Sequence, residues 1–157
     1  MAERLRRLET IYERWPIYFV TTCTAERRDL LANQLIHTTF LKFVENASAR
    51  GAWVGRYVLM PDHLHLFLAL EDDRIRLSEW IRSLKNTISK VLRTRGDMSP
   101  YWQKGFFDHV MRSGDSYSQK WEYVRANPVR ARLVNRPEDW PYSGEIHELE
   151  YRKDLIL

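Results

Sequence analysis

Two histidines separated by a single residue are the side chains of this sequence whose spacing most directly suggests chemistry. His63 and His65 stand at the start of an apolar run, residues 63–70, that is typical of a β-strand. Residues two apart on a strand project from the same face, so the two imidazoles can bind one metal ion. Taken alone, such a pair is more often two paired polar groups at a sheet edge, because a metal site also needs a third ligand.

A second polar group lies later in the chain, in a predicted helix over residues 117–126. One side of this helix is apolar, and another side carries Lys120, Tyr123 and Asn127. Because positions i and i+4 are neighbours on a helix, Tyr123 and Asn127 can reach one site. Pro128 disfavours the helical conformation for the residue before it, so we expect Asn127 at the end of the helix.

The surrounding pattern predicts the elements that must position these side chains. Strands are expected over residues 18–24, 53–60, 63–70 and within 98–112, and helices over 33–50, 77–95 and 117–126. Pro61 and Asp62 favour a tight turn between two of the strands. The first six elements match the split β-α-β ferredoxin-like order. We therefore expect an α+β fold, with the histidine strand central in an antiparallel sheet, helices packed on one face, and a C-terminal tyrosine helix.

The length of the chain suggests one domain over residues 1–157. Residues 1–14 form a basic N-terminal extension whose apolar spacing indicates a short helix, and residues 129–157 are interpreted as an irregular tail. Within the predicted helices, we expect Asp115 or Ser116 to cap the last one and His37 to lie on the surface.

The composition of the chain argues against several classes of protein and permits others. No apolar run approaches the ~18 residues that cross a membrane, and we find no apolar signal segment. The single cysteine, Cys23, allows no internal disulfide, which fits the cytoplasm. A net charge of +4 and a pI near 9.3 permit a polyanionic partner. No glycine-rich phosphate loop is found, so no nucleotide cofactor is expected.

Basic side chains follow one side of the predicted helix 77–95. Arg82, Lys85, Ser89 and Arg93 recur every three or four residues, and no acidic residue interrupts the row. Such a row is usually a solvated face, and contact with phosphate is the second interpretation. The cations that we expect to bind DNA are Arg82, Lys85, Arg93, Arg112, Lys120, Arg125 and Arg130.

Two motifs taken together carry a family resemblance. Residues 60–66, Met-Pro-Asp-His-Leu-His-Leu, resemble the His-hydrophobic-His motif of single-tyrosine HUH transposases. Residues 123–131, Tyr-Val-Arg-Ala-Asn-Pro-Val-Arg-Ala, are similar to the tyrosine helix of the REP-associated tyrosine transposases, a subgroup related to the IS200/IS605 transposases. Residues 101–103 and 107–112 also resemble that subgroup. The similarity covers roughly residues 18–143, and the two motifs at this separation are specific.

The resemblance implies a metal-dependent enzyme that cuts and rejoins single-stranded DNA next to hairpins, in DNA transposition or in repeat processing. Tyr123 would be the nucleophile that forms a 5′-phosphotyrosine intermediate. The metal, Mg or Mn, would be bound by His63, His65 and Asn127. Lys120 could activate the phenol or hold the phosphate, or be an ordinary surface lysine.

Several alternatives stay open at this point. Asp62 and His109 are expected to support the metal ligands from behind, although a purely structural role also suits His109. HIT-type hydrolases are discounted, because they continue the alternation with a third histidine where this chain has Phe67. Replication-initiator and relaxase HUH nucleases are closer, but they commonly use a third histidine on the same strand system, which this sequence does not show. A ferredoxin-like module that binds hairpin DNA or RNA without cutting it is the alternative function. The resemblance allows a monomer or a homodimer, and no membrane partner is expected.

Overall fold

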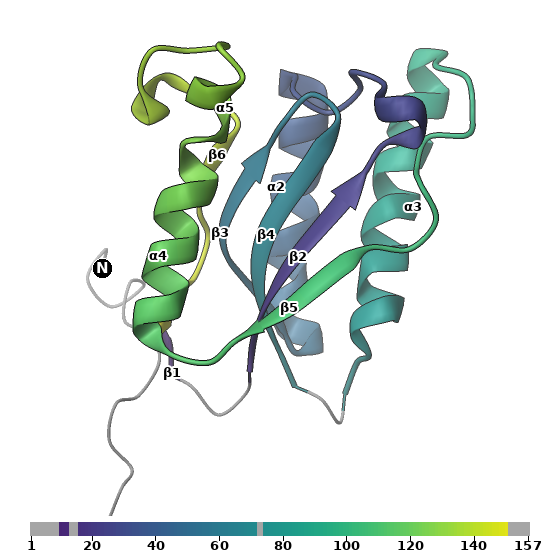
Figure 1. The fold of residues 1–157 in the computed structure, drawn as a ribbon. Coiled ribbons are helices and arrows are strands. Elements are labelled where there is room, and N and C mark those ends of the chain that lie inside the picture. The colour runs from purple at the N-terminus through teal and green to yellow at the C-terminus, as the bar shows by residue number, and fades with distance from the viewer. Residues whose placement is uncertain (1–9, 13–15, 72–73, 151–157) are drawn as a thin grey trace, which may run out of the picture.

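The computed structural model describes residues 10–12, 16–71 and 74–150 (Figure 1). The strands are β1 (Thr10–Tyr12), β2 (Ile17–Cys23), β3 (Ala52–Leu59), β4 (His63–Leu70), β5 (Phe107–Met111), β6 (Ser143–Glu145) and β7 (Glu148–Glu150). The α-helices are α2 (Gln34–Ala47), α3 (Leu77–Arg95), α4 (Gly114–Arg125) and α5 (Asn127–Arg130). Short 3-10 turns cover Ala25–Arg27, Ser48–Arg50 and Pro137–Asp139. No helix within these residues is both long and apolar enough to span a membrane.

The main sheet has five strands in the order β5-β2-β4-β3-β6, and all neighbouring pairs are antiparallel. Without β6, the order of the strands is that of a ferredoxin-like sheet, so the predicted α+β fold class is confirmed. β4 lies in the centre of the sheet, as expected, and a tight turn through Pro61 and Asp62 joins it to β3. Met60 N donates to His63 O at 2.8 Å across that turn.

α2 and α3 cover one face of the sheet (Figure 1). Both helices bury the predicted apolar stripes, which include Phe40 on α2 and Trp80 on α3. The caps follow the sequence: Asn33 Oδ1 accepts a hydrogen bond from Ile36 N at the start of α2, and Gly96 ends α3 in the left-handed conformation. These two helices build most of the core and leave the opposite face of the sheet to α4.

α4 packs on that opposite face, in front of the sheet in Figure 1. Tyr117 and Val124 are buried against it, and the ring centroids of Tyr117 and Phe67 are 4.7 Å apart. The packing places the helix by its apolar side. The polar row of α4 is therefore turned away from the core.

Both ends of the chain differ from expectation. Thr10–Tyr12 is a strand, β1, that pairs in parallel with β7, so the predicted helix is wrong there, and residues 1–9, 13 and 14 lie outside the described residues. Residues 129–150 are irregular only in part, because β6 joins the sheet beside β3 and β7 pairs with β1, and residues 151–157 are outside the described part. The cause is tertiary pairing of short segments that have weak strand patterns of their own.

Three local expectations also need correction. Ser113, not Asp115 or Ser116, caps α4 by accepting a hydrogen bond from Ser116 N. Asn127 is the first residue of the separate short helix α5, since a turn at position 126 ends α4 and Pro128 is tolerated in a first helical turn. His37 is half-buried, and its Nε2 lies 2.7 Å from the hydroxyl of the buried Tyr57.

Candidate active site

The two histidines of β4 lie side by side, and each Nδ1 atom has a hydrogen-bond partner. The ring centroids of His63 and His65 are 4.7 Å apart. Asp62 Oδ1 lies 2.8 Å from Nδ1 of His63, and Thr21 Oγ1 lies 2.8 Å from Nδ1 of His65. In the tautomer in which both Nδ1 atoms donate, the Nε2 atoms keep their lone pairs and can bind a metal. Asp62, which was predicted to support the ligands, thus contacts His63 directly.

Thr21 is a contact that the sequence analysis missed. It stands opposite His65 in the register of β2 with β4, and residues directly opposite in an antiparallel pair share a face. The sequence Thr21-Thr22 contains no signal that tells which threonine faces the histidines. Only the register of the two strands decides it, and the register is a tertiary property.

Arg27 is the second missed residue, and it holds Asp62 from behind. Its Nε lies 2.8 Å from Asp62 Oδ2, and its Nη1 lies 3.0 Å from Cys23 Sγ. Glu26 and Arg27 both have φ of 54°, a left-handed conformation that costs about 1–2 kcal/mol per residue. Strained backbone of this kind clusters at functional sites. The sequence of this loop contains two adjacent arginines and does not distinguish them.

The electrostatics of the site favour neutral His65 and ionised Asp62. Burial lowers the pKa of His65 to about 3, and the positive charges of His63, Lys120, Arg130 and Arg27 act in the same direction. Neutral imidazole is the form that offers a lone pair to a metal. Burial alone would raise the pKa of Asp62, but the hydrogen bond and charge of His63, together with Arg27, hold that pKa below its ordinary value.

Tyr123 lies on the polar side of α4 with 62% of its surface exposed. Lys120, one turn earlier, has its Nζ 5.8 Å from the centroid of the Tyr123 ring and 4.8 Å from that of Phe19. Phe19 in turn stacks on His65 with ring centroids 5.2 Å apart. A continuous series of contacts therefore joins the histidine pair to the phenol, on one face of the sheet.

Asn127 is joined to the same tyrosine through Arg130. The Nη2 of Arg130 donates to Asn127 Oδ1, and its Cζ lies 4.0 Å from the centroid of the Tyr123 ring. The amide oxygen predicted as a metal ligand is thus engaged by a guanidinium. Among the described residues, no group of three or more His, Cys, Asp or Glu is arranged to bind a metal. Within that part of the chain, a third ligand would come from another residue type, such as Asn127.

The basic row of α3 lies on the other face of the sheet from Tyr123. Arg82 and Arg93 are exposed there. Lys85 instead donates to the carbonyl oxygens of Gln103 and Gly105, and burial lowers its pKa. The predicted DNA-binding residues of α3 are therefore not brought to the candidate site, and Lys85 fixes the segment that leads into β5.

The remaining predicted residues lie near α4 and β5. Arg125 forms ion pairs with Glu138 at 2.9 Å and Glu122 at 3.4 Å. Arg112 is exposed directly after β5. His109 is exposed on β5 opposite Phe19, and no hydrogen bond joins it to His63 or His65 in the described part of the chain. Lys120 and Arg130 are thus the predicted cations that contact Tyr123.

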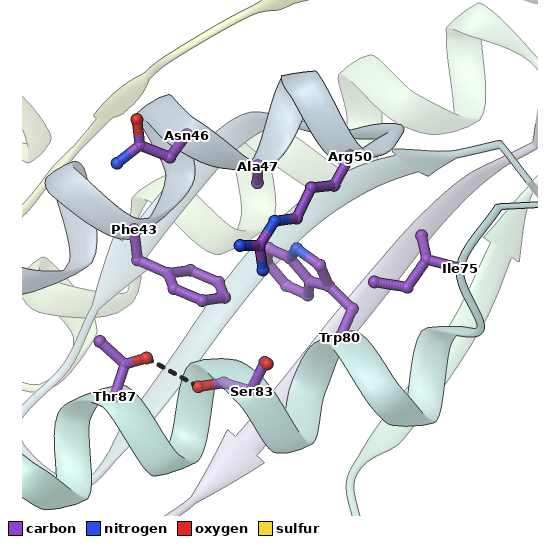
Figure 2. A pocket seen from close by; sticks show the side chains of 8 residues that line it. All are labelled: Phe43, Asn46, Ala47, Arg50, Ile75, Trp80, Ser83 and Thr87. Atoms are coloured by element: carbon purple, nitrogen blue, oxygen red, sulfur yellow. Dashed lines mark hydrogen bonds between the residues drawn. The ribbon is translucent and has the colours of Figure 1, made fainter.

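A pocket of about 280 Å³ lies between α2 and α3, away from this site (Figure 2). Phe43 and Trp80, which both line it, pack against each other with ring centroids 5.5 Å apart. The lining residues are Phe43, Asn46, Ala47, Arg50, Ile75, Trp80, Ser83 and Thr87. None of the predicted site residues lines it, so this pocket and the candidate active site are separate.

Solved structures share this fold. A REP-associated tyrosine transposase bound to a REP hairpin aligns with a TM-score of 0.69 and 24% identity, over 85% of this chain and 78% of that chain. A candidate transposase from Deinococcus radiodurans aligns with a TM-score of 0.52 and 15% identity, over 72% of this chain and 91% of that chain.

Sequence comparisons give the family. A candidate REP-associated tyrosine transposase of Haemophilus influenzae is 28% identical over 96 residues, 55% of this chain and 54% of the relative, so the chain spans about half the length of that relative. A second protein of the same organism, of unassigned function, is 20% identical over 144 residues, 71% of this chain and 79% of the relative. The sequence profile described as "Transposase IS200 like" matches residues 16–127, which include both histidines, Tyr123 and Asn127. The chain therefore belongs to the IS200-like transposase family.

Proposed function

We propose that this chain cleaves and rejoins single-stranded DNA beside hairpin sequences through a covalent bond to Tyr123. The observation that carries the proposal is the series of contacts from His65 through Phe19 and Lys120 to Tyr123 on one sheet face. The family supports DNA transposition as the process. The hairpin-bound relative supports a hairpin as the partner.

The donor set fits a divalent metal at His63, His65 and Asn127. Both Nε2 atoms can act as ligands while the Nδ1 atoms donate to Asp62 and Thr21. A divalent ion bound there would supply Lewis-acid polarisation of the scissile phosphate. We propose Mg or Mn, because an amide oxygen and phosphate oxygens would complete the ligand set. Asn127 can join it only when Arg130 releases its oxygen.

The cations beside Tyr123 would bind and orient the DNA phosphate. Lys120 and Arg130 flank the ring, and Arg130 presents the planar fork that matches phosphate oxygens. Movement of Arg130 from Asn127 to the phosphate would free the amide oxygen at the moment when DNA arrives. Substrate binding and completion of the ligand set would then be one event.

The chemical step is a transesterification. The phenolic oxygen of Tyr123 attacks the phosphorus, a Tyr–O–P bond forms, and the bond from phosphorus to the 3′ oxygen breaks. The phenol gives up one proton and the 3′ oxygen gains one, so the products are a 5′-phosphotyrosine and a free 3′ hydroxyl. The new ester keeps the bond energy, and a second 3′ hydroxyl can reverse the step and rejoin the strand.

Adduct formation tests this proposal. A library of labelled single strands, with a fixed hairpin and randomised flanks, is incubated with the protein and MnCl₂ or MgCl₂ and resolved under denaturing conditions. We expect a slower protein–DNA adduct that Tyr123→Phe and His63→Ala abolish, and that EDTA prevents. Tyr142→Phe, at a half-buried tyrosine outside this site, is the matched control and should keep the adduct. An adduct that persists in Tyr123→Phe contradicts the assigned nucleophile, and equal cleavage of double-stranded DNA contradicts the substrate class.

A module that binds hairpin DNA or RNA without cutting is the second candidate. The observation in its favour is that Arg82 and Arg93 are exposed on α3, on the face opposite Tyr123. Binding by this module needs neither Tyr123 nor a metal. Retention of hairpin DNA without any adduct, in the presence of Mn²⁺, would favour it.

A further inference from the structure

An aromatic side chain is exposed on the edge strand of the sheet, on the same face as the histidines. Phe107 begins β5 with 72% of its surface exposed. It stands opposite Thr21 in the register of β5 with β2, and Thr21 stands opposite His65 in the register of β2 with β4. Because directly opposite residues share a face, Phe107, Thr21 and His65 form one row across the sheet.

The spacing of this row suits a neighbouring nucleotide. Adjacent strands lie about 4.8 Å apart, so the backbones at Phe107 and His65 are separated by about 10 Å. Phe107 thus lies near the histidine pair, but far enough away to leave space for a phosphate at the histidines. A strand whose phosphate lay at the histidines could place a flanking base over β5.

β5 carries a second exposed ring on this face after Phe107, and its last residue is then buried under α4. His109, two residues on, is exposed on the same face about 6.7 Å further along. Met111, at the other end of β5, is buried with Tyr117 and Val124. The open part of the strand therefore carries two successive flat rings, and none of the helices in the described part of the chain covers them.

The charges around this surface suit a polyanion. Arg112 is exposed directly after β5, and Lys120 lies over Phe19, the residue opposite His109. Exposed aromatic rings on a sheet, flanked by cations, are the arrangement with which proteins stack the unpaired bases of a single strand. A protein partner would not require these cations beside the exposed rings.

We propose that the exposed part of β5 is a base-stacking platform for the unpaired nucleotides next to the cleaved phosphate, with Phe107 as its main contact. The inference rests on the proposed single-stranded DNA substrate. Phe107 would bind and position the strand without taking part in the chemical step. Stacking tolerates every base, so the platform adds affinity for unpaired DNA and no sequence preference.

Affinities measured in EDTA distinguish the contribution of base contacts from the contribution of phosphate contacts. The probes are a fluorescein-labelled oligothymidine and an abasic sugar-phosphate strand of equal length, titrated at one salt concentration because phosphate contacts depend on salt. We expect the wild type to bind the oligothymidine more tightly than the abasic strand. The expected ratio is between about five-fold and about a hundred-fold for a single stacked base.

Variants on the two faces of β5 provide the controls. Phe107→Ala should lose the preference for oligothymidine and keep its affinity for the abasic strand, whereas Phe107→Trp should retain the preference. Val110→Ala removes an exposed apolar side chain from the face of β5 opposite to Phe107 and His109, and this variant should behave as the wild type. Equal binding of both probes by the wild type, or an undiminished preference in Phe107→Ala, would overturn the platform.

The outcome is independent of the cleavage test. A base preference that depends on Phe107, in a protein that forms no adduct with Mn²⁺, would support the platform and contradict the proposed function. An adduct that depends on Tyr123, in a protein with no base preference, would support the proposed function and contradict the platform. Since Phe107 is exposed, its removal should leave thermal unfolding unchanged, and that measurement checks the variant.

Discussion

The hydrogen bond that Thr21 accepts from Nδ1 of His65 allows a quantitative test of the candidate metal site. Thr21→Val keeps the shape of the side chain and removes the hydroxyl that lies 2.8 Å from Nδ1 of His65. The ring then loses the partner that fixes its tautomer. In a half-buried setting, an unpartnered N–H costs about 1–3 kcal/mol.

The expected loss of metal affinity follows from that cost. Removal of groups that support metal ligands typically weakens metal binding about 10- to 100-fold, which corresponds to about 1.4–2.7 kcal/mol. The two ranges agree, so we expect the dissociation constant for Mn²⁺ to rise by about 10- to 100-fold in Thr21→Val. Thr21→Ser restores a hydroxyl and should recover most of the affinity.

The next residue provides the matched control. Thr22 is 1% exposed, and its hydroxyl has no hydrogen-bond partner among the described residues. Thr22→Val makes the same chemical change outside the site, and it should leave Mn²⁺ binding unchanged while adding about 1 kcal/mol to the free energy of unfolding. Mn²⁺ titration followed by electron paramagnetic resonance measures the affinity. Unchanged affinity in Thr21→Val, or an equal loss in Thr22→Val, would refute the reasoning.

Three further predictions test other contacts. Arg27→Gln removes the ion pair with Asp62 and should weaken Mn²⁺ binding without lowering the melting temperature, because an exposed ion pair adds little stability; a lower melting temperature with unchanged Mn²⁺ affinity would argue for a structural role. Burial lowers the pKa of His37. Protonation therefore favours the unfolded state, and urea unfolding midpoints should fall as the pH drops below about 6.5, less steeply in His37→Gln; parallel pH profiles would contradict this. Gly55→Ala places a Cβ 2.7 Å from a side-chain atom of β7 and should destabilise the fold by about 1–3 kcal/mol, measured by urea unfolding; a neutral result would show that β7 can move away.

The elements with strong periodic patterns could be predicted from the sequence, and those made by pairing could not. α3 begins and ends where its apolar stripe and Gly96 indicate, because these signals are local. β6 has three residues and two of them are Gly144 and Glu145, which have low strand propensity. It forms because β3 offers an open edge to it. No local pattern contains that information.

The candidate site divides in the same way. His63, His65, Tyr123 and Asn127 were selected by residue type and spacing, and the structure joins the tyrosine to His65 and to Asn127 through intervening contacts. The residues that hold the ligands in place could not be selected. Thr21 depends on strand register, and Arg27 depends on a left-handed backbone that its sequence does not favour.

The central position of β4 has a consequence for amide hydrogen exchange. Both neighbours of β4 bond to it along nearly its whole length, so its amides exchange with solvent only when the sheet itself opens. α4 is attached by one apolar side and can exchange through smaller openings. Deuterium uptake should therefore be slowest around the histidines and faster around Tyr123. Local fluctuations of α4 would change the position of the phenol, while the strand that carries the imidazoles would remain as rigid as the core.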